Sequence, residues 1–111
     1  MRRRQGAGAL DRAMRLERPE RIEASDGEAQ TVFTDTGLVF AALDAASLAE
    51  RQAGGRIDGL ASHVGRLRHG TGIAGGWRLV EGGRVFHVLA VDDSAARRTG
   101  EVVCLLQEEG R

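Results

Sequence analysis

Apolar and polar residues alternate along much of the chain, and turn-forming residues divide the alternation into short runs. The clearest runs are residues 77–80, 85–91 and 101–107, which predict three strands of an antiparallel meander. Gly82 and Gly83 separate the first two runs, where a tight hairpin needs residues that accept positive φ. Residues 85–91 carry apolar side chains at both odd and even positions, which point to opposite faces of a strand. Both faces must therefore be largely covered, as in a sandwich, a barrel or an oligomer.

Strict alternation also assigns the side chains of these strands to faces. Within residues 85–91 it places Phe86, Val88 and Ala90 on one face and the remaining side chains on the other. Cys104 is the only cysteine, so an intrachain disulfide is excluded. Its position in the middle of the last apolar run predicts a buried and unreactive thiol.

The first half of the chain predicts three further strands. Residues 10–18 alternate, and Pro19, the only proline, is expected to end this strand because it has no N–H to donate. Residues 30–34 are β-branched and aromatic, which favours a second strand. The Asp-Thr-Gly sequence at residues 35–37 predicts a turn into a third strand at residues 38–43, which is apolar on both faces.

The pattern changes at Asp44. Residues 44–55 have high helix propensity, and Ser47 and Glu50 have the spacing of a capping box. This run is too short for a long amphipathic helix. We therefore expect one short helix within a long mobile loop, residues 44–59, and long polar loops in small domains are usually functional or disordered.

Alternation resumes in residues 60–69. Gly65 and Leu67 fall on one face of this predicted strand, and Arg66 and Arg68 fall on the other. The sum is an all-β fold, a small antiparallel barrel or sandwich of six to seven strands with one short helix in a long loop.

Length and charge restrict the function classes. The 111 residues fit one domain, residues 10–111, preceded by a flexible arginine-rich segment at residues 1–9. The formal net charge is zero, so composition gives no overall reason to bind nucleic acid or a membrane. No apolar signal core follows Arg2, Arg3 and Arg4, and we expect the protein to be made and used in the cytosol. All 16 basic residues are arginine, which fits codon bias better than a need for bidentate contacts.

Residue patterns typical of catalysis are nearly absent. His63, His69 and His87 fit no metal-ligand spacing. Ser62 and His63 are adjacent, so on a strand they would point to opposite faces, which argues against a nucleophile and base pair. The glycine-rich stretches match neither a P-loop nor a dinucleotide fingerprint. We expect no catalytic activity, no metal and no cofactor.

The arginines are the remaining functional candidates. Arg51 and Arg56 flank the loop, and Arg66 and Arg68 could form a positive stripe, either in salt bridges or against phosphate. An alternative function is therefore a small β-barrel that binds the backbone of single-stranded nucleic acid through Arg66, Arg68 and Arg84. The scarcity of aromatic residues and the neutral charge argue against it. A ligand-binding barrel or enzyme subunit would need a convergent polar site, which the sequence does not offer.

The order of the predicted elements carries a resemblance. A first strand that ends in Arg18-Pro19, the LVFAAL strand at residues 38–43, the SHVGRLRH strand at residues 62–69 and the hairpin at residues 77–88 follow one another with the spacing seen in phage head–tail joining proteins. From about residue 10 to residue 109, the chain resembles that family.

The resemblance implies a structural role without catalysis. Members are small barrels that form a ring, taken here as a hexamer, between the capsid portal or adaptor protein and the tail terminator or tail tube protein of a phage or gene transfer agent. It implies assembly in the bacterial cytoplasm, a final location in the particle neck, no membrane, no cofactor, and a stopper that seals the DNA channel. The loop would face the channel and touch double-stranded DNA transiently and without sequence preference, through Ser47, Glu50, Arg51, Gln52 and Arg56. Contacts with neighbouring subunits would fall to Arg2, Arg3, Arg4, Arg66 and Arg68.

Overall fold

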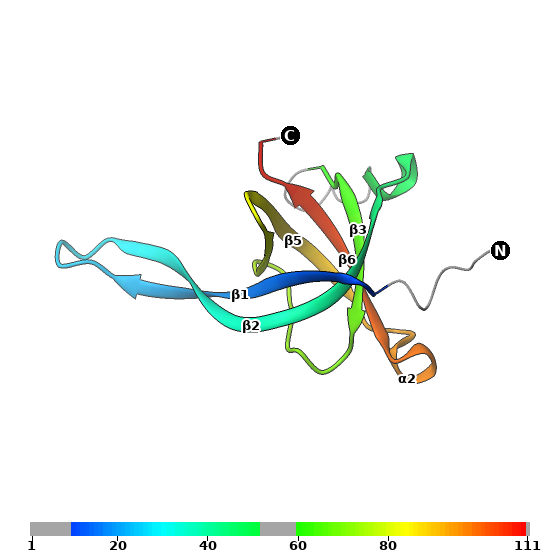
Figure 1. The fold of residues 1–111 in the computed structure, drawn as a ribbon. Helices are drawn as coiled ribbons and strands as arrows, with labels where there is room; N and C mark the ends of the chain where they lie inside the picture. The colour runs from blue at the N-terminus through cyan, green and yellow to red at the C-terminus, as the bar shows by residue number, and fades with distance from the viewer. Residues whose placement is uncertain (1–9, 52–59, 111) are drawn as a thin grey trace.

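The computed structural model describes residues 10–51 and 60–110, which form a six-stranded antiparallel barrel (Figure 1). The strands are β1 (Arg12–Glu23), β2 (Ala29–Ala45), β3 (His63–Arg68), β4 (Arg78–Glu81), β5 (Arg84–Asp92) and β6 (Glu101–Glu108). A helical turn occupies residues 48–51, and a second short helix that the sequence pattern did not predict, α2 (Ala96–Thr99), precedes β6. None of the helices within these ranges is long and apolar enough to cross a membrane. The predicted all-β fold is confirmed.

The barrel closes through a pairing between its first and fourth strands. The strand order around it is β1-β2-β3-β6-β5-β4, and every neighbouring pair is antiparallel. Closure depends on three residues of β1, where Leu16 lies opposite Leu79 and Glu17 opposite Arg78. A closed sheet leaves no unpaired edge inside the barrel wall.

The core is formed by alternate side chains that point into the barrel. Phe86 is fully buried, and each large apolar side chain buried in this way stabilises the fold by about 1.5–3 kcal/mol. Burial also raises the pKa of the Cys104 thiol to about 12, which agrees with the predicted unreactive cysteine. The largest fully buried side chains come from five of the six strands, namely Met14, Leu16, Leu67, Leu79, Phe86, Cys104 and Leu106.

The predicted meander is confirmed, but one face assignment within it is wrong. β4, β5 and β6 pair in sequence order, as expected. A bulge lies at Leu89, since Val88 pairs with Leu106 while Ala90 pairs with the next residue, Leu105. Because a bulge shifts the alternation by one residue, Val91 rather than Ala90 packs against the core.

The predicted division of the first half into three strands is wrong. β1 continues through Pro19 to Glu23, and Pro19 pairs with Phe33. At Pro19 the strand has already passed its last pair with β4, so it is an edge strand, where a missing N–H is tolerated. The two apolar runs that were expected to be separate strands form the single 17-residue strand β2.

The Asp-Thr-Gly sequence of residues 35–37 forms a bulge in β2 instead of a turn. Arg15 pairs with Leu38 and Glu17 with Asp35, so β2 carries one more residue than β1 over this interval. Gly37 has a φ of +120°, a conformation that glycine adopts readily. The barrel therefore has six strands.

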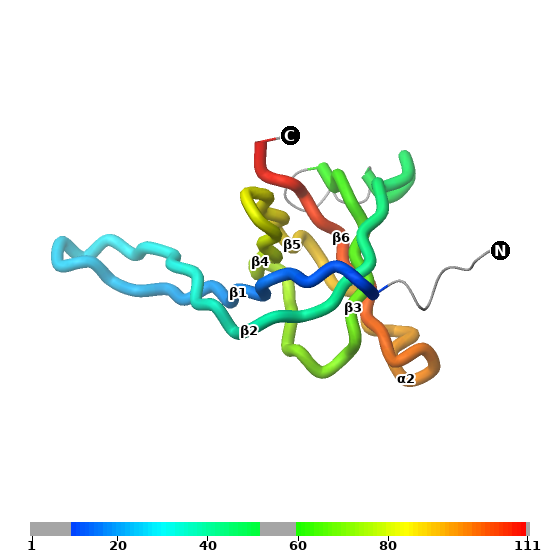
Figure 2. Tube along the Cα trace, in the orientation of Figure 1, coloured from blue at the N-terminus to red at the C-terminus, as the bar shows by residue number. Residues whose placement is uncertain are grey.

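The outer halves of β1 and β2 project from the barrel as a long hairpin. We call residues 18–34 the hairpin arm, which extends to the left in Figures 1 and 2. Its tip is closed by hydrogen bonds between Ala24 and Glu28 (N to O, 2.7 Å) and between Gly27 and Ala24 (N to O, 2.9 Å). Because of the arm, the molecule measures 57 × 29 × 28 Å. The sequence pattern did not predict this projection.

Candidate functional site

The loop that was predicted to face a channel begins with the expected capping box. The Ser47 backbone N–H donates to Glu50 Oε1 (2.8 Å), and the Glu50 N–H donates to Ser47 Oγ (3.2 Å). The Arg51 N–H donates to the Ser47 carbonyl (2.9 Å), and the Arg51 side chain is exposed. Gln52 and Arg56, the other two predicted loop contacts, lie outside the described residues. The start of the loop is thus a capped helical turn beside the barrel rim.

The two ends of this loop are held together at the rim. The Ala46 N–H donates to the Ser62 carbonyl (3.0 Å), which joins the end of β2 to the start of β3. The Ser62 N–H donates to the Leu106 carbonyl (2.7 Å), and the Glu108 N–H donates to Ser62 Oγ (2.8 Å). The loop is therefore anchored on β6 independently of what lies between its ends.

The predicted separation of the Ser62 and His63 side chains is wrong. Ser62 Oγ lies 2.8 Å from His63 Nδ1. β3 begins at His63, so Ser62 precedes the strand and does not follow its alternation. The His63 ring packs edge-on against Phe86, with centroids 5.3 Å apart, and Ser62 Oγ is bound by the β6 backbone. Both side chains thus take part in the rim and core contacts.

Within residues 10–51 and 60–110, no three His, Cys, Asp or Glu side chains are grouped so that they could hold a metal ion.

Of the arginines predicted to contact nucleic acid, Arg66 of the stripe and Arg84 are paired with carboxylates. Arg66 Nη1 donates to Glu101 Oε1 (2.8 Å), and Arg84 Nε donates to Glu108 Oε2 (2.8 Å). The hydrogen bond to Glu108 raises the pKa of the Arg84 guanidinium above its usual value. Arg68 is exposed on the outer wall of β3. Arg2, Arg3 and Arg4 lie outside the described residues.

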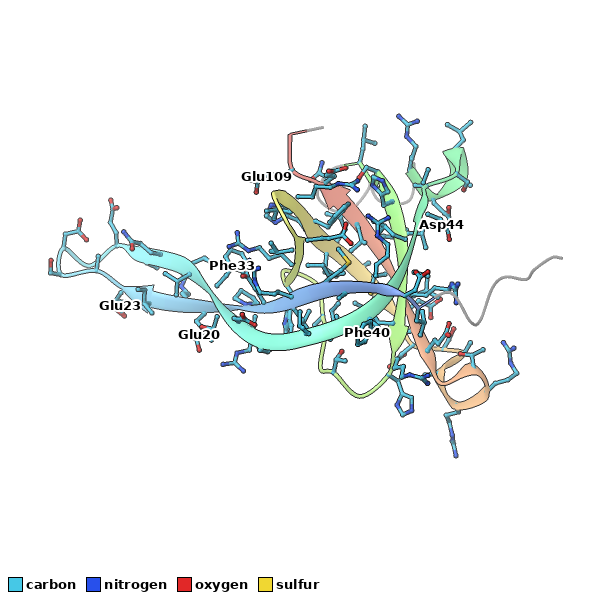
Figure 3. The ribbon with its side chains drawn as sticks, in the orientation of Figure 1. Glu20, Glu23, Phe33, Phe40, Asp44 and Glu109 are labelled. Atoms are coloured by element: carbon cyan, nitrogen blue, oxygen red, sulfur yellow. The ribbon has the colours of Figure 1, made fainter. Side chains whose placement is uncertain are left out.

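The base of the hairpin arm is fixed to the barrel by aromatic and ionic contacts. The Arg78 guanidinium lies 4.0 Å from the centroid of the Phe33 ring, and Arg78 Nε also donates to Glu17 Oε1. Figure 3 labels Phe33 at this junction. Glu17 is buried, and a buried carboxylate needs such a partner. Beyond Pro19 and Phe33, the two strands of the arm pair only with each other in the described structure.

An apolar pair is exposed on the outer wall of β2. Leu38 and Phe40 alternate with the inward residues of the strand, and 66% and 57% of their surfaces are exposed. We call these two side chains the β2 face; Figure 3 labels Phe40 on it. Arg15 pairs with Leu38 from β1, and Arg68 follows the Ala41–Leu67 pair on β3, so arginines lie on both sides. The sequence pattern predicted a strand that is apolar on both faces, and the rest of the described structure leaves this face exposed.

Comparison with known proteins identifies the family. Residues 6–110 match the model of the phage head completion protein family. The chain belongs to this family. The predicted relationship to head–tail joining proteins is thereby confirmed, and it covers the barrel, the hairpin arm and the loop. No curated protein matches the chain.

Two solved structures share the fold of this head completion protein. One chain of the virion of a native gene transfer agent particle is 22% identical, with a TM-score of 0.62, and the match covers 89% of this chain and 93% of that chain. A protein from Shigella flexneri 2a, solved in solution, is 18% identical, with a TM-score of 0.69, and the match covers 96% and 99% of the two chains. The barrel with its arm is thus a recurrent fold.

Sequence reasoning located the loop but missed the arm and the β2 face. The signal for the arm was present, because residues 30–34 favour a strand and the next turn-like sequence contains a single glycine. A bulge and a turn have similar composition, and only the pairing partner of each residue distinguishes them.

Proposed function

We propose that this head completion protein is a stopper-type connector that forms a ring between the capsid portal or adaptor protein and the tail of a phage or gene transfer agent. The observation that carries the proposal is the family match, which spans residues 6–110. The gene transfer agent virion that contains a chain of the same fold supports a location in a particle neck. The role has no catalytic step. Subunits would be made in the bacterial cytoplasm and incorporated as the particle matures.

In this ring, the loop of residues 44–59 would face the channel and hold packaged DNA in place. Its ends are anchored at one rim of a closed barrel, through Ala46, Ser62 and β6. Such an anchor fixes the position of the loop on the barrel. Ser47 and Glu50 form the capped turn at the loop's start, and Arg51 presents an exposed cation to the DNA backbone.

The alternative role in binding single-stranded nucleic acid has less support. It depends on Arg66, Arg68 and Arg84, and two of these three guanidinium groups donate to Glu101 and Glu108. Phosphate binding would have to replace those partially buried pairs, which lowers its net gain. Neutral net charge also suits a channel that must release DNA.

Electron microscopy of intact particles from the producing strain tests the connector role. We expect density for the barrel and arm as a ring of six copies at the junction between capsid and tail. Absence of the chain from purified particles would overturn the proposal. A ring with another number of copies would revise the stoichiometry alone.

A loop deletion tests the channel assignment separately. Removal of residues 49–55 is expected to leave the barrel folded, because the Ala46–Ser62 anchor remains, and to let DNA leak from filled particles. Nuclease-protected DNA per particle is the measurement. The control is R98A, which removes an exposed arginine from α2 without altering the loop. Full DNA retention by the deletion variant would refute the channel role while leaving the neck location intact.

A further inference from the structure

The outer part of the hairpin arm has an apolar face that residues 10–51 and 60–110 leave exposed. Ile22 and Val32 are 45% and 37% exposed. Ile22 pairs with Gln30 and Glu20 pairs with Val32, so the two apolar side chains lie on the same face of the hairpin. A two-stranded hairpin alone is marginally stable in water. The arm is therefore expected to gain a partner when the protein is in its working state.

The charges at the arm and at the β2 face are complementary. The hairpin arm, residues 18–34, carries two arginines, Arg18 and Arg21, against four carboxylates, so its formal charge is 2 − 4 = −2. Those carboxylates are Glu20, Glu23, Asp26 and Glu28; Figure 3 labels two of them, Glu20 and Glu23. The β2 face is flanked by Arg15 from β1, which lies 3.7 Å from Asp35, and by Arg68 from β3. The apolar pair on this net acidic arm thus matches an apolar pair with arginines on both sides.

The lengths are also compatible with contact between copies. The long dimension of the molecule, 57 Å, is about twice the other two, 29 and 28 Å, so the arm extends roughly one barrel width beyond its own barrel. Figure 2 shows the arm leaving the barrel at the end of β1 that is remote from Arg12, while β2 continues from the arm into the barrel wall. The arm cannot fold back on the β2 face of its own chain, because β2 is a continuous strand through both.

We propose that the Ile22–Val32 face of the arm packs on the Leu38–Phe40 face of a second copy of this chain. The two surfaces differ, so the contact is heterologous, and repeated head-to-tail contacts of this kind generate a ring when their rotation closes. This inference rests on the proposed connector function and assigns the surfaces through which its subunits meet.

The contact is expected to be weak between two isolated copies. Each side offers two large apolar side chains, which is far less than the roughly 1,200–2,000 Å² of total area buried in a stable interface. Closure of a ring adds avidity, because each further contact becomes intramolecular. A method that detects transient encounters is therefore needed.

Intermolecular paramagnetic relaxation provides the test. A nitroxide is attached to the S25C variant at the exposed arm tip. This chain is mixed with wild-type chain that carries no nitroxide and is enriched in ¹⁵N. Cys104 is buried and its thiol pKa is raised to about 12, so it stays unmodified. We expect the amide signals of Leu38, Phe40 and Arg68 to lose at least half of their intensity at millimolar concentration, relative to the sample with reduced label.

Two controls separate a specific contact from random collision. A label at E109C, which lies on the barrel and not on the arm (Figure 3), should leave those three signals unchanged. F40D in the ¹⁵N-enriched chain should restore the signals; Phe40 is 57% exposed, so the barrel is expected to stay folded, and L38D serves if it does not. Absence of broadening, or broadening greatest on the partner's own arm, would overturn the proposed surfaces. A chain that fails this test yet appears at the particle neck would keep its connector function.

Discussion

The Arg78 guanidinium lies 4.0 Å from the centroid of the Phe33 ring, and this contact ties the projecting arm to the closing strand of the barrel. Arg78 also donates to the buried Glu17, so one side chain joins β4 to both strands of the arm's base. The direction in which the arm leaves the barrel depends on this cluster. A stacked arginine with a bidentate-capable guanidinium is not replaceable by lysine at such a site.

Loss of the Phe33 ring should loosen the arm and spare the barrel. F33A removes a cation–π contact of about 0.5–1 kcal/mol together with apolar contact area, so we expect faster amide hydrogen exchange in residues 20–32 and unchanged exchange in β3 and β6. T31A, on the exposed part of the same strand, is the matched control. Equal acceleration in the barrel would show that the cluster supports the whole fold instead.

The Arg12–Glu81 pair should give the barrel a defined acid sensitivity. The hydrogen bond from Arg12, Nε to Oε2 at 3.0 Å, holds the pKa of Glu81 below its usual value. A lowered folded-state pKa contributes stability above the unfolded pKa, and this contribution is lost as pH falls through the folded value. Wild type should therefore exceed E81Q in free energy of unfolding at neutral pH, and the difference should vanish in strong acid.

Urea denaturation between pH 2 and pH 7 measures this difference. E23Q is the control, because the Glu23 side chain is exposed on the arm and makes no hydrogen bond or ion pair with the described residues. The pair is partly exposed, so its effect is expected to be small. A gap between wild type and E81Q that is independent of pH would contradict the ionic explanation.

Gly65 should be restricted to glycine by its neighbour in the core. A Cβ at this position would lie 3.0 Å from Leu106 Cδ1, and Leu106 is fully buried. We expect G65V to destabilise the barrel by about 1–3 kcal/mol through overpacking. In an L106A background the added side chain fills space, so the same change should lose most of its effect. A double-mutant cycle by urea denaturation measures the coupling, and additive effects would rule out the steric account.

Cys104 should react only when the barrel opens. Burial raises the pKa of the Cys104 thiol to about 12, so its thiolate fraction at pH 8 is roughly a thousandfold below that of a free cysteine. The surrounding core also shields the sulfur from reagents. Alkylation by iodoacetamide should follow the unfolding transition in urea. Rapid modification of the native protein would show that the barrel opens locally at β6.

The parts of the fold that sequence predicted are those fixed by local chemistry. Gly82 and Gly83 form the turn of the β4–β5 hairpin, and the capping box of Ser47 and Glu50 is present as expected, because each depends on residues within four positions of one another. Closure of the barrel depends on pairing between β1 and β4, more than 60 residues apart, and no local pattern encodes it.

Of the candidate functional surfaces, the sequence likewise predicted one and missed another. The loop was recognisable from its composition. The β2 face was not, because an apolar residue gives the same pattern whether its own chain or another copy covers it. Leu38 and Phe40 were predicted only to lie in a strand that is apolar on both faces, and the three-dimensional arrangement shows that they are exposed.

The anchor between Ala46 and Ser62 has a consequence for how such proteins diverge. Once the two ends of a loop are held together, the entropy of closure grows only with the logarithm of loop length, by about 0.6 kcal/mol for each doubling. Insertions and deletions between these residues therefore leave barrel stability nearly unchanged. In the ring that we propose, lineages could adjust the aperture to their own genome and tail through this one segment, while the barrel that carries it stays constant.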